Sequence, residues 1–285
     1  MKIHKTLIVI VAFVCALSIG SILNTTSEYK FPKDTKLGYK VSNEITQTMT
    51  MMGQEQSNAI TSSEKMYILS LGLVDDNNFK VEFYIDDVNI KADNPQINLD
   101  GVDFSFITNK KSSALVSKKG VVSSVEEVDV VEFPEDQILR SVTQQYNPAV
   151  LFSRFFLVLP EKELKVGESW EDTKTETNDD IGGEMAIVNE FSYTVLEALE
   201  YNGYNCFKID ASSKMSYLGQ GAQMGQEFKV SGSGKGTATF YFAHEEGILV
   251  GYEVYNSSDI NMDFTAMDMT IPMVSTLSSK VELIK

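Results

Sequence analysis

The strongest constraint on the fold is a two-residue alternation of apolar and polar side chains. In residues 79–86 the apolar positions are Phe79, Val81, Phe83 and Ile85, and mostly polar side chains lie between them. The same period recurs in 187–195 and 238–242. Successive side chains of an extended chain point to opposite faces, so this period is typical of strands with one buried face. The chain is therefore predicted to be mainly β.

Turn-forming sequences separate the predicted strands. Asn202-Gly203 is the clearest, because Asn and Gly tolerate the positive φ angles of a two-residue hairpin turn. Similar clusters stand at 75–78, 118–120 and 245–247. Tight turns pair successive strands antiparallel. We therefore expect large antiparallel meander sheets, or one such sheet, curled into an open barrel or a sandwich.

One stretch, 133–159, departs from the strand period and is predicted to be a short two-helix insert. Pro134 and the acidic pair after it are typical of a helix start, and apolar residues follow at helical spacing. Asn147-Pro148 has the order of an N-cap and a first helical residue, and so predicts a second helix.

This insert divides a single predicted β-rich domain, 36–285, into a first meander, 36–132, and a second, 160–285. Turn residues of the two meanders align at a nearly constant spacing, as Gly38 does with Gly167. The two halves are therefore candidates for an internal duplication.

The N-terminus has the order of a secretory signal. Basic residues precede an uncharged apolar run from Thr6 to Leu23, so 1–23 is predicted to be a signal peptide or an N-terminal anchor. Cleavage after Gly20 is favoured, and lipid attachment at Cys15 is a weaker alternative because bulky residues precede it. Residues 24–35 are expected to be a linker. The protein is expected to be extracytoplasmic: secreted, periplasmic or anchored facing outward.

Charge and cysteine content restrict the partners. The chain has 40 acidic and 24 basic residues, for a formal net charge of −16. Nucleic acids and anionic lipids are bound chiefly by clustered basic side chains, so no nucleic acid is expected, and membrane contact is expected only through an uncleaved 1–23. Beyond that segment Cys206 is the only cysteine. No internal disulfide is therefore expected.

The stretch SGSGKGT, 231–237, superficially matches a phosphate-binding loop. A Walker-type loop needs a further glycine where Lys229 stands, Ser or Thr after the lysine, and a following helix. Here Gly236 follows the lysine, and the next residues alternate as a strand does. Glycines at 232, 234 and 236 would instead clear one face of a strand for a bend or a close approach.

No constellation for catalysis, metal or cofactor binding is found. His244 is the only histidine beyond residue 4, and it stands in a predicted turn. Zinc needs several Cys or His ligands. Weak calcium binding at Asp86-Asp87 or Asp179-Asp180 and a glycan-cleaving carboxylate pair are alternatives that the sequence does not single out. We therefore expect no enzyme, no metal and no cofactor.

Two apolar features could carry binding. The insert contains a dense apolar block, from which Leu151, Phe152, Phe155 and Phe156 are candidates to line an apolar ligand site between helices and sheet. Ordinary core packing is the alternative. Methionines gather in the strand regions, and flexible thioethers suit adaptable apolar surfaces. Their positions are Met49, Met51, Met52, Met215, Met224, Met262, Met267, Met269 and Met273.

Residues 159–170, LPEKELKVGESW, contain a recurrent element: Leu-Pro, three residues, an apolar residue, any residue, then Val-Gly-Asp/Glu-x-Trp. With this motif and the later Gly-x-Gly-x-Gly-Thr strand before Gly-Ile-Leu, the chain resembles an uncharacterised family of exported bacterial β-rich proteins. The resemblance implies export and β-architecture, and no activity or catalytic residue. Physically, Gly167 is expected to form a turn and Trp170 to anchor the next strand by burying its ring.

These observations favour an exported, non-enzymatic binding protein that holds an apolar, lipid-like ligand between sheet and helices. The alternative is a structural or protein-interaction component of the cell envelope, with an envelope protein as its partner.

Overall fold

The computed structural model describes residues 27–51, 53–94, 97, 99, 101–178, 183–223 and 226–284. The predicted signal segment, 1–23, lies outside them. The elements in chain order are β1 (Lys36–Met51), β2 (Gln54–Leu73), β3 (Asn78–Ala92), β4 (Ser112–Ser117), β5 (Val122–Glu127), α1 (Gln137–Thr143), η1 (Gln144–Tyr146), α2 (Pro148–Phe155), β6 (Ser169–Asn178), β7 (Gly183–Tyr201), β8 (Tyr204–Gln223), β9 (Gln226–Ala243), β10 (Ile248–Phe264), η2 (Thr265–Met267) and β11 (Met269–Ile284).

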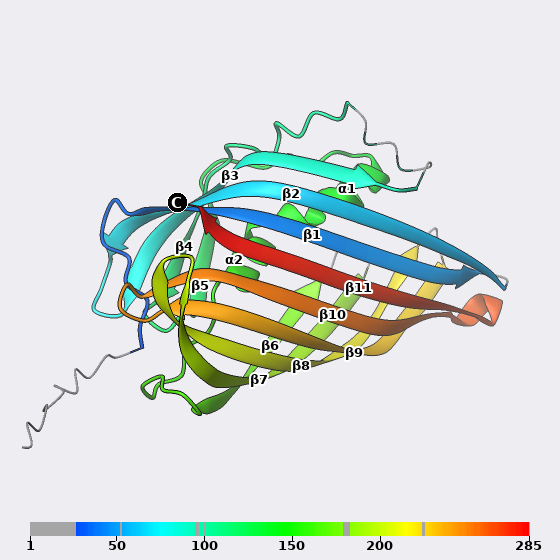
Figure 1. Ribbon diagram of the computed structural model, residues 1–285. Helices are drawn as coiled ribbons and strands as arrows, with labels where there is room; N and C mark the ends of the chain where they lie inside the picture. The colour runs from blue at the N-terminus through cyan, green and yellow to red at the C-terminus, as the bar shows by residue number, and fades with distance from the viewer. Residues whose placement is uncertain are drawn as a thin grey trace, which may run out of the picture.

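All the described strands form one antiparallel sheet, in the order β5-β4-β3-β2-β1-β11-β10-β9-β8-β7-β6. The first five strands meander outward to one edge, and β6 to β11 meander inward from the other. β11 then lies beside β1, where Tyr39 pairs with Leu283. The sheet is strongly curved and its edges remain apart (Figure 1). The predicted mainly β, open meander fold is confirmed, as one sheet rather than a sandwich. The duplication stays a hypothesis.

The four predicted turns lie at one end of the sheet, which we call the base. They join β2 to β3, β4 to β5, β7 to β8 and β9 to β10. In the β7–β8 turn Asn202 and Gly203 have φ angles of 50° and 80°, as a hairpin turn of this kind requires. The opposite end, where β1, β6, β8 and β10 finish, is called the far end.

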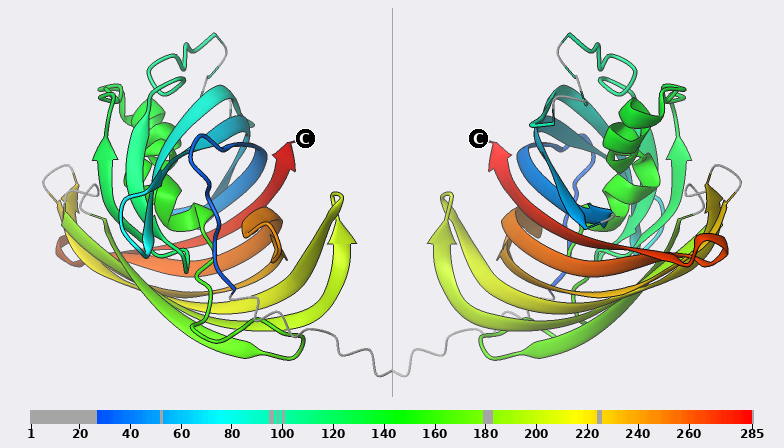
Figure 2. Two further views of the ribbon diagram at one scale, coloured as in Figure 1. Left: turned by 90° about the vertical axis from the view of Figure 1, so that its left-hand side faces the viewer. Right: turned by 90° about the vertical axis from the view of Figure 1, so that its right-hand side faces the viewer.

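The helical insert lies inside the curve of the sheet (Figure 2). Because β5 and β6 are opposite edges, the chain between them has to cross the sheet, and it crosses on the concave side. Asp136 caps α1 by accepting a hydrogen bond from the Leu139 amide at 2.8 Å. α2 begins at Pro148, directly after Asn147. No helix formed by the described residues is long and apolar enough to cross a bilayer.

Residues 27–35 are not a linker, which corrects the expectation for the described part of 24–35. Tyr29 and Phe31 are buried in the main core. The Tyr29 amide donates to the Lys118 carbonyl at 2.7 Å, and the Lys30 amide donates to the Gly247 carbonyl at 2.9 Å. This N-terminal segment therefore joins the β4–β5 and β9–β10 turns across the base, and its two rings supply core packing.

Strand register places concave-facing side chains in rows that cross the sheet. Near the base, Val41 pairs with Val281, which pairs with Tyr252, and all three are buried. Toward the far end, Met49 pairs with Met273, which pairs with Ile260. The main core fills the base half, and a smaller cluster around Phe228, Val230, Phe264 and Ile271 lies at the far end.

Candidate functional site

The four residues predicted to line a ligand site are packed into the core at the base. Phe152, Phe155 and Phe156 are 1 %, 5 % and 5 % exposed, and Leu151 is half-buried against the same core. The Phe155 ring lies edge-on to Tyr39, with centroids 4.8 Å apart. The expected open space between α2 and the sheet is therefore corrected: at the base, side chains fill it, as the core-packing alternative supposed.

The two predicted anchor residues stand where the crossing chain enters β6. Gly167 has a φ of 88°, and its amide donates to the Val195 carbonyl at 2.8 Å. This is the left-handed conformation that glycine adopts at least cost. The Trp170 ring stacks on Tyr193 with centroids 5.0 Å apart, and its Nε1 donates to the Val158 carbonyl at 3.1 Å. The indole is half-buried, so part of it stays accessible.

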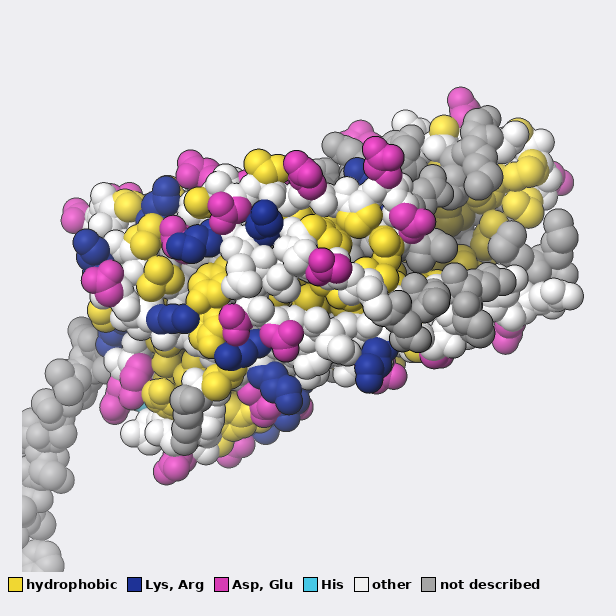
Figure 3. Space-filling view, turned by 90° about the horizontal axis from the view of Figure 1, so that it is seen from above, with side chains coloured by type: hydrophobic (Ala, Val, Ile, Leu, Met, Phe, Trp, Pro, Cys, Tyr) yellow, Lys and Arg dark blue, Asp and Glu magenta, His cyan; other side chains and the backbone are white. Residues whose placement is uncertain are grey.

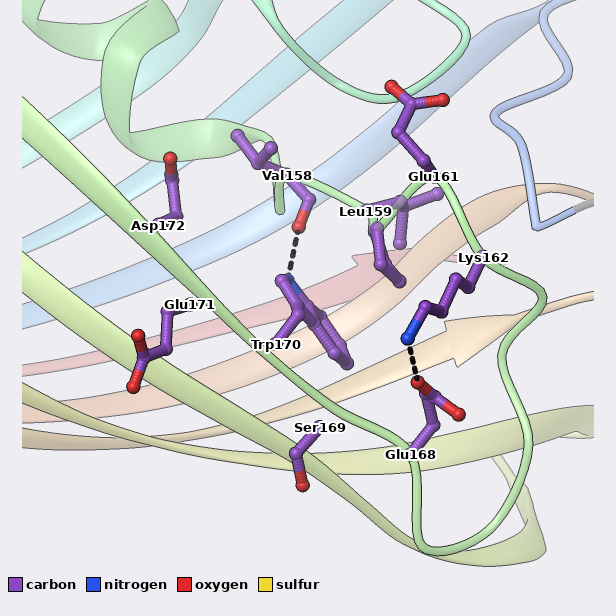
Figure 4. Close-up of a pocket in the computed structure, with 10 residues that line it drawn as sticks. Val158, Leu159, Glu161, Lys162, Glu168, Ser169, Trp170, Glu171 and Asp172 are labelled. Carbon is purple, nitrogen blue, oxygen red and sulfur yellow. Dashed lines mark hydrogen bonds and ion pairs between the residues drawn. The ribbon is translucent and has the colours of Figure 1, made fainter.

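A shallow groove of about 340 Å³ lies beside Trp170 (Figure 4). Its lining is Val158, Leu159, Pro160, Glu161, Lys162, Glu168, Ser169, Trp170, Glu171 and Asp172. Lys162 pairs with Glu168 at 3.8 Å, and Lys165 pairs with the same carboxylate at 3.9 Å. Most of the lining belongs to the motif at 159–170, but the sequence did not predict a groove there, because the crossing chain and β6 form it together.

The interpretation of 231–237 as a strand is confirmed, because these residues lie inside β9. Gly232, Gly234 and Gly236 face the concave side, in register with Ile260, Ser258 and Asn256. A Cβ on Gly234 would come within 2.5 Å of Ser258 Oγ and 2.9 Å of the Met215 methyl. Side chains from the neighbouring strands β8 and β10 therefore occupy the space above these glycines. Residues 231–237 form a strand and not a phosphate-binding loop.

A buried carboxyl group lies where the helical insert meets β2. Glu64 is 3 % exposed and accepts a hydrogen bond of 2.5 Å from Tyr146 Oη. Asn43 donates to the two carboxyl oxygens of Glu64 at 3.4 and 3.3 Å. Burial raises the pKa of Glu64 above its ordinary value, and the hydrogen bonds from Ser62, Tyr146 and Asn43 oppose that shift. The buried carboxyl group therefore links the insert to β1 and β2 through hydrogen bonds that solvent does not reach.

A partly exposed apolar surface lies on the concave side at the far end. We define the far-end apolar surface as Met49, Met185, Ile187, Ile260, Met262 and Met273, all half-buried. These residues come from β1, β7, β10 and β11, and most of them pack against the small far-end cluster. Hydrophobic side chains line a hollow at this end of the molecule (Figure 3). The helical insert covers the base half of the concave side.

The predicted methionine grouping is reproduced in part. Met49, Met262 and Met273 belong to the far-end apolar surface, and Met269 packs against the same cluster. Met215 is buried and Met267 is 48 % exposed on η2. The side chains of Met51, Met52 and Met224 lie outside the described structure. Met185 was missed, because a single methionine in an alternating strand gives no distinct signal.

The edge strand β6, which lies next to β7 of this surface, carries charged side chains. Asp172, Lys174 and Glu176 alternate with exposed threonines and face the concave side, where Glu176 pairs with Ile187. Burial lowers the pKa of Lys174, and the charges of Asp172 and Glu176 oppose this shift. Asp172 Oδ2 is buried and has no hydrogen-bond partner. An inward charge on an edge strand also discourages pairing with another chain.

The remaining residues singled out in the sequence are Cys206 and His244. Cys206 is buried, and burial raises the pKa of its thiol to about 11, so the thiolate is scarce at neutral pH. His244 lies beside the Phe207 ring, with centroids 4.6 Å apart. Within the described residues, no three His, Cys, Asp or Glu side chains converge in a way that could hold a metal ion.

Comparisons with known proteins add little. No protein-family model matches the chain, and no curated protein does. An outer membrane channel from Pseudomonas putida F1 is similar at 7 % identity, covering 90 % of this chain and 98 % of that one, with a TM-score of 0.22. A putative outer membrane lipoprotein-sorting protein domain from Vibrio parahaemolyticus is 7 % identical, covering 92 % and 87 %, with a TM-score of 0.19. Likeness this low carries no argument about function.

Proposed function

We propose that the protein is an extracytoplasmic, non-enzymatic binding protein that holds the acyl chain of an amphiphile on the far-end apolar surface. This surface replaces the space under α2 as the site. The export signal predicted for 1–23 supports the location. An envelope component that binds a protein partner is the alternative function.

The observation that supports acyl-chain binding is a half-buried apolar row on the concave side. From β1 to β7 the row reads Met49, Met273, Ile260, Gly232, Tyr217 and Ile187. Five strand spacings extend this row over roughly 24 Å, which suits a long, slender apolar ligand. Partly exposed apolar side chains gathered on one concave face are typical of ligand sites.

The shape of the surface favours a chain over a globular partner. A stable protein–protein interface buries about 800 Å² on each partner. Here the apolar residues lie inside the curve of the sheet, where a folded partner would meet the strand ends first. Methionine side chains are flexible, so they can adapt to chains of different length and unsaturation.

A matched pair of variants on β11 tests the proposal. Met273 faces the concave surface, and its neighbour Val274 is 45 % exposed on the opposite face. We expect N-phenyl-1-naphthylamine to bind saturably at one site per protein. A carboxylate in the apolar contact is costly, so Met273→Glu should weaken binding about tenfold or more, and Val274→Glu should leave it unchanged.

Two results would contradict the proposal. One is the absence of saturable probe binding, and the other is an equal effect of the two variants. If no probe binds but the protein captures an envelope protein in a manner that Met273→Glu abolishes, the alternative function is supported.

A further inference from the structure

We infer that the acyl chain held on the far-end apolar surface belongs to an uncharged, hydroxyl-bearing lipid of the monoacylglycerol class. This inference rests on the proposed function and adds the chemical class of the head group. The head group lies on the row of concave-facing side chains next to the apolar row.

A row that carries amide and hydroxyl groups runs beside the apolar row, on its base side. From β1 to β7 this polar row reads Gln47, Ser275, Ser258, Gly234, Met215 and Asn189. Each residue stands two positions from its neighbour in the apolar row on the same strand, so the two rows are roughly 7 Å apart. A head group can therefore reach the polar row while its chain lies on the apolar row.

The polar row offers hydrogen-bonding groups to a ligand. Gln47 is exposed, and Ser275 and Asn189 are half-buried. The hydroxyl group of Ser258 lies 2.7 Å from Tyr217 Oη, which belongs to the apolar row. Amide and hydroxyl side chains both donate and accept hydrogen bonds, so together they match the hydroxyl groups and the ester carbonyl of a glycerol ester.

The concave side is uncharged where these rows lie. From β1 to β7, the next row toward the base reads Ile45, Leu277, Asn256, Gly236, Ser213 and Phe191. None of the residues in the three rows is charged, whereas the convex faces of the same strands carry charges such as Glu44, Lys214 and Asp259. A charged head group on the polar row would lose water without gaining an opposite charge, which is costly.

The edge strand β6 does not change this preference in favour of an anion. Lys174 is in register with Asn189 of the polar row, and Asp172 and Glu176 flank it on the same face of β6. Two carboxylates outweigh one ammonium group here, so a carboxylate or phosphate head group gains no net attraction from this edge.

Competition against bound N-phenyl-1-naphthylamine at pH 8 tests the head-group class. The ligands are 1-lauroylglycerol, methyl laurate, laurate and dodecyltrimethylammonium, each below the concentration at which it forms micelles. We expect 1-lauroylglycerol to bind roughly tenfold more tightly than either charged ligand, because these must bury a charge. It should bind severalfold more tightly than methyl laurate, which has no hydroxyl donors.

A matched pair of variants on β11 locates the head group. Ser275→Ala removes a hydroxyl group of the polar row and should weaken 1-lauroylglycerol roughly threefold to tenfold, while N-phenyl-1-naphthylamine binds as before. Ser278→Ala removes an exposed hydroxyl group on the convex face and should change neither. Gln47→Leu removes the amide at the β1 end of the row and should act as Ser275→Ala does.

Two sets of results separate this inference from the acyl-chain proposal. Equal displacement by all four ligands, tighter binding of a charged ligand, or full affinity for 1-lauroylglycerol in both Ser275→Ala and Gln47→Leu would overturn the inference and leave acyl-chain binding standing. Failure of every ligand to displace the bound probe would contradict acyl-chain binding itself, and the inference would fall with it.

Discussion

Tyr146 donates a hydrogen bond of 2.5 Å to Glu64, and this contact joins the helical insert to β2 across 82 positions of the chain. The same carboxyl group receives hydrogen bonds from Asn43 on β1. Elsewhere the insert is held mainly by aromatic packing, as in the contact of Phe152 with Phe83. The Glu64 contact is therefore a buried polar link between the insert and the sheet, in addition to the hydrogen bond from Trp170 Nε1 to the Val158 carbonyl.

This buried carboxyl group predicts a pH dependence of stability. The pKa of Glu64 is raised from its ordinary value of 4.5, chiefly by burial, so the folded state holds the proton more tightly than the unfolded state does. Its contribution is fully present below pH 4.5 and is lost as the pH rises through the folded pKa. Glu64→Gln cannot ionise and should not show this loss.

The measurement is urea unfolding of both proteins at pH 4 and pH 7.5. Wild type should lose free energy of unfolding relative to Glu64→Gln between the two pH values. Glu190→Gln, an exposed change, should track wild type at both. A difference between wild type and Glu64→Gln that stays constant with pH would show that Glu64 keeps an ordinary pKa.

The close contacts above the glycines on the concave face of β9 predict that alanine is not tolerated at Gly236. A Cβ there would lie 2.6 Å from Ser213 Oγ and would overlap the Asn256 side chain. We expect Gly236→Ala to cost about 1–3 kcal/mol of unfolding free energy. Adding Asn256→Ala should recover part of that cost, because it removes the overlapping group.

Thermal or urea unfolding of the single and double variants checks this. Thr237→Ala, exposed on the opposite face of the same strand, should change stability by less than about 0.5 kcal/mol. If Gly236→Ala has the same free energy of unfolding as wild type, the concave face of β9 has room for a side chain at this position.

The N-terminal segment predicts a strong effect at Tyr29. This side chain is 1 % exposed, its hydroxyl donates to the Leu157 carbonyl at 3.2 Å, and it accepts from the Leu157 amide at 3.0 Å. Tyr29→Ala should cost about 3–5 kcal/mol. Tyr29→Phe keeps the ring and should cost about 1–2 kcal/mol. If Tyr29→Ala unfolds at the same denaturant concentration as wild type, the segment is the linker that the sequence suggested.

Much of the fold follows from local sequence rules. Alternation predicts the strands, and Asn202-Gly203 predicts a turn whose two φ angles are positive. Pro134 precedes α1, and Pro148 is the first residue of α2. The turn between β1 and β2 at the far end was not predicted, because its sequence, Met-Gly-Gln, has neither the Asn-Gly pair of 202–203 nor the charged or Asn-rich cluster of the other base turns.

The sites could not be predicted in the same way, because they depend on register. Met49 and Met273 are far apart in sequence and meet only because β11 returns beside β1. The dense apolar block around Phe155 is a strong sequence signal, but composition alone does not say whether such a block fills a core or lines a cavity. The burial of Tyr29 and Phe31 was missed because two aromatic residues before the first long strand are too short a pattern.

The central claim is that an acyl chain lies on the far-end apolar surface, and methyl-labelled methionine NMR tests it most directly. On titration with a long-chain fatty alcohol, the methyl signals of Met49, Met185, Met262 and Met273 should shift saturably. The signal of Met66, which is 3 % exposed in the main core, should stay in place. Shifts at Met66 with none at Met273 would place the ligand under the helices, and no saturable shift at any methionine would contradict the claim.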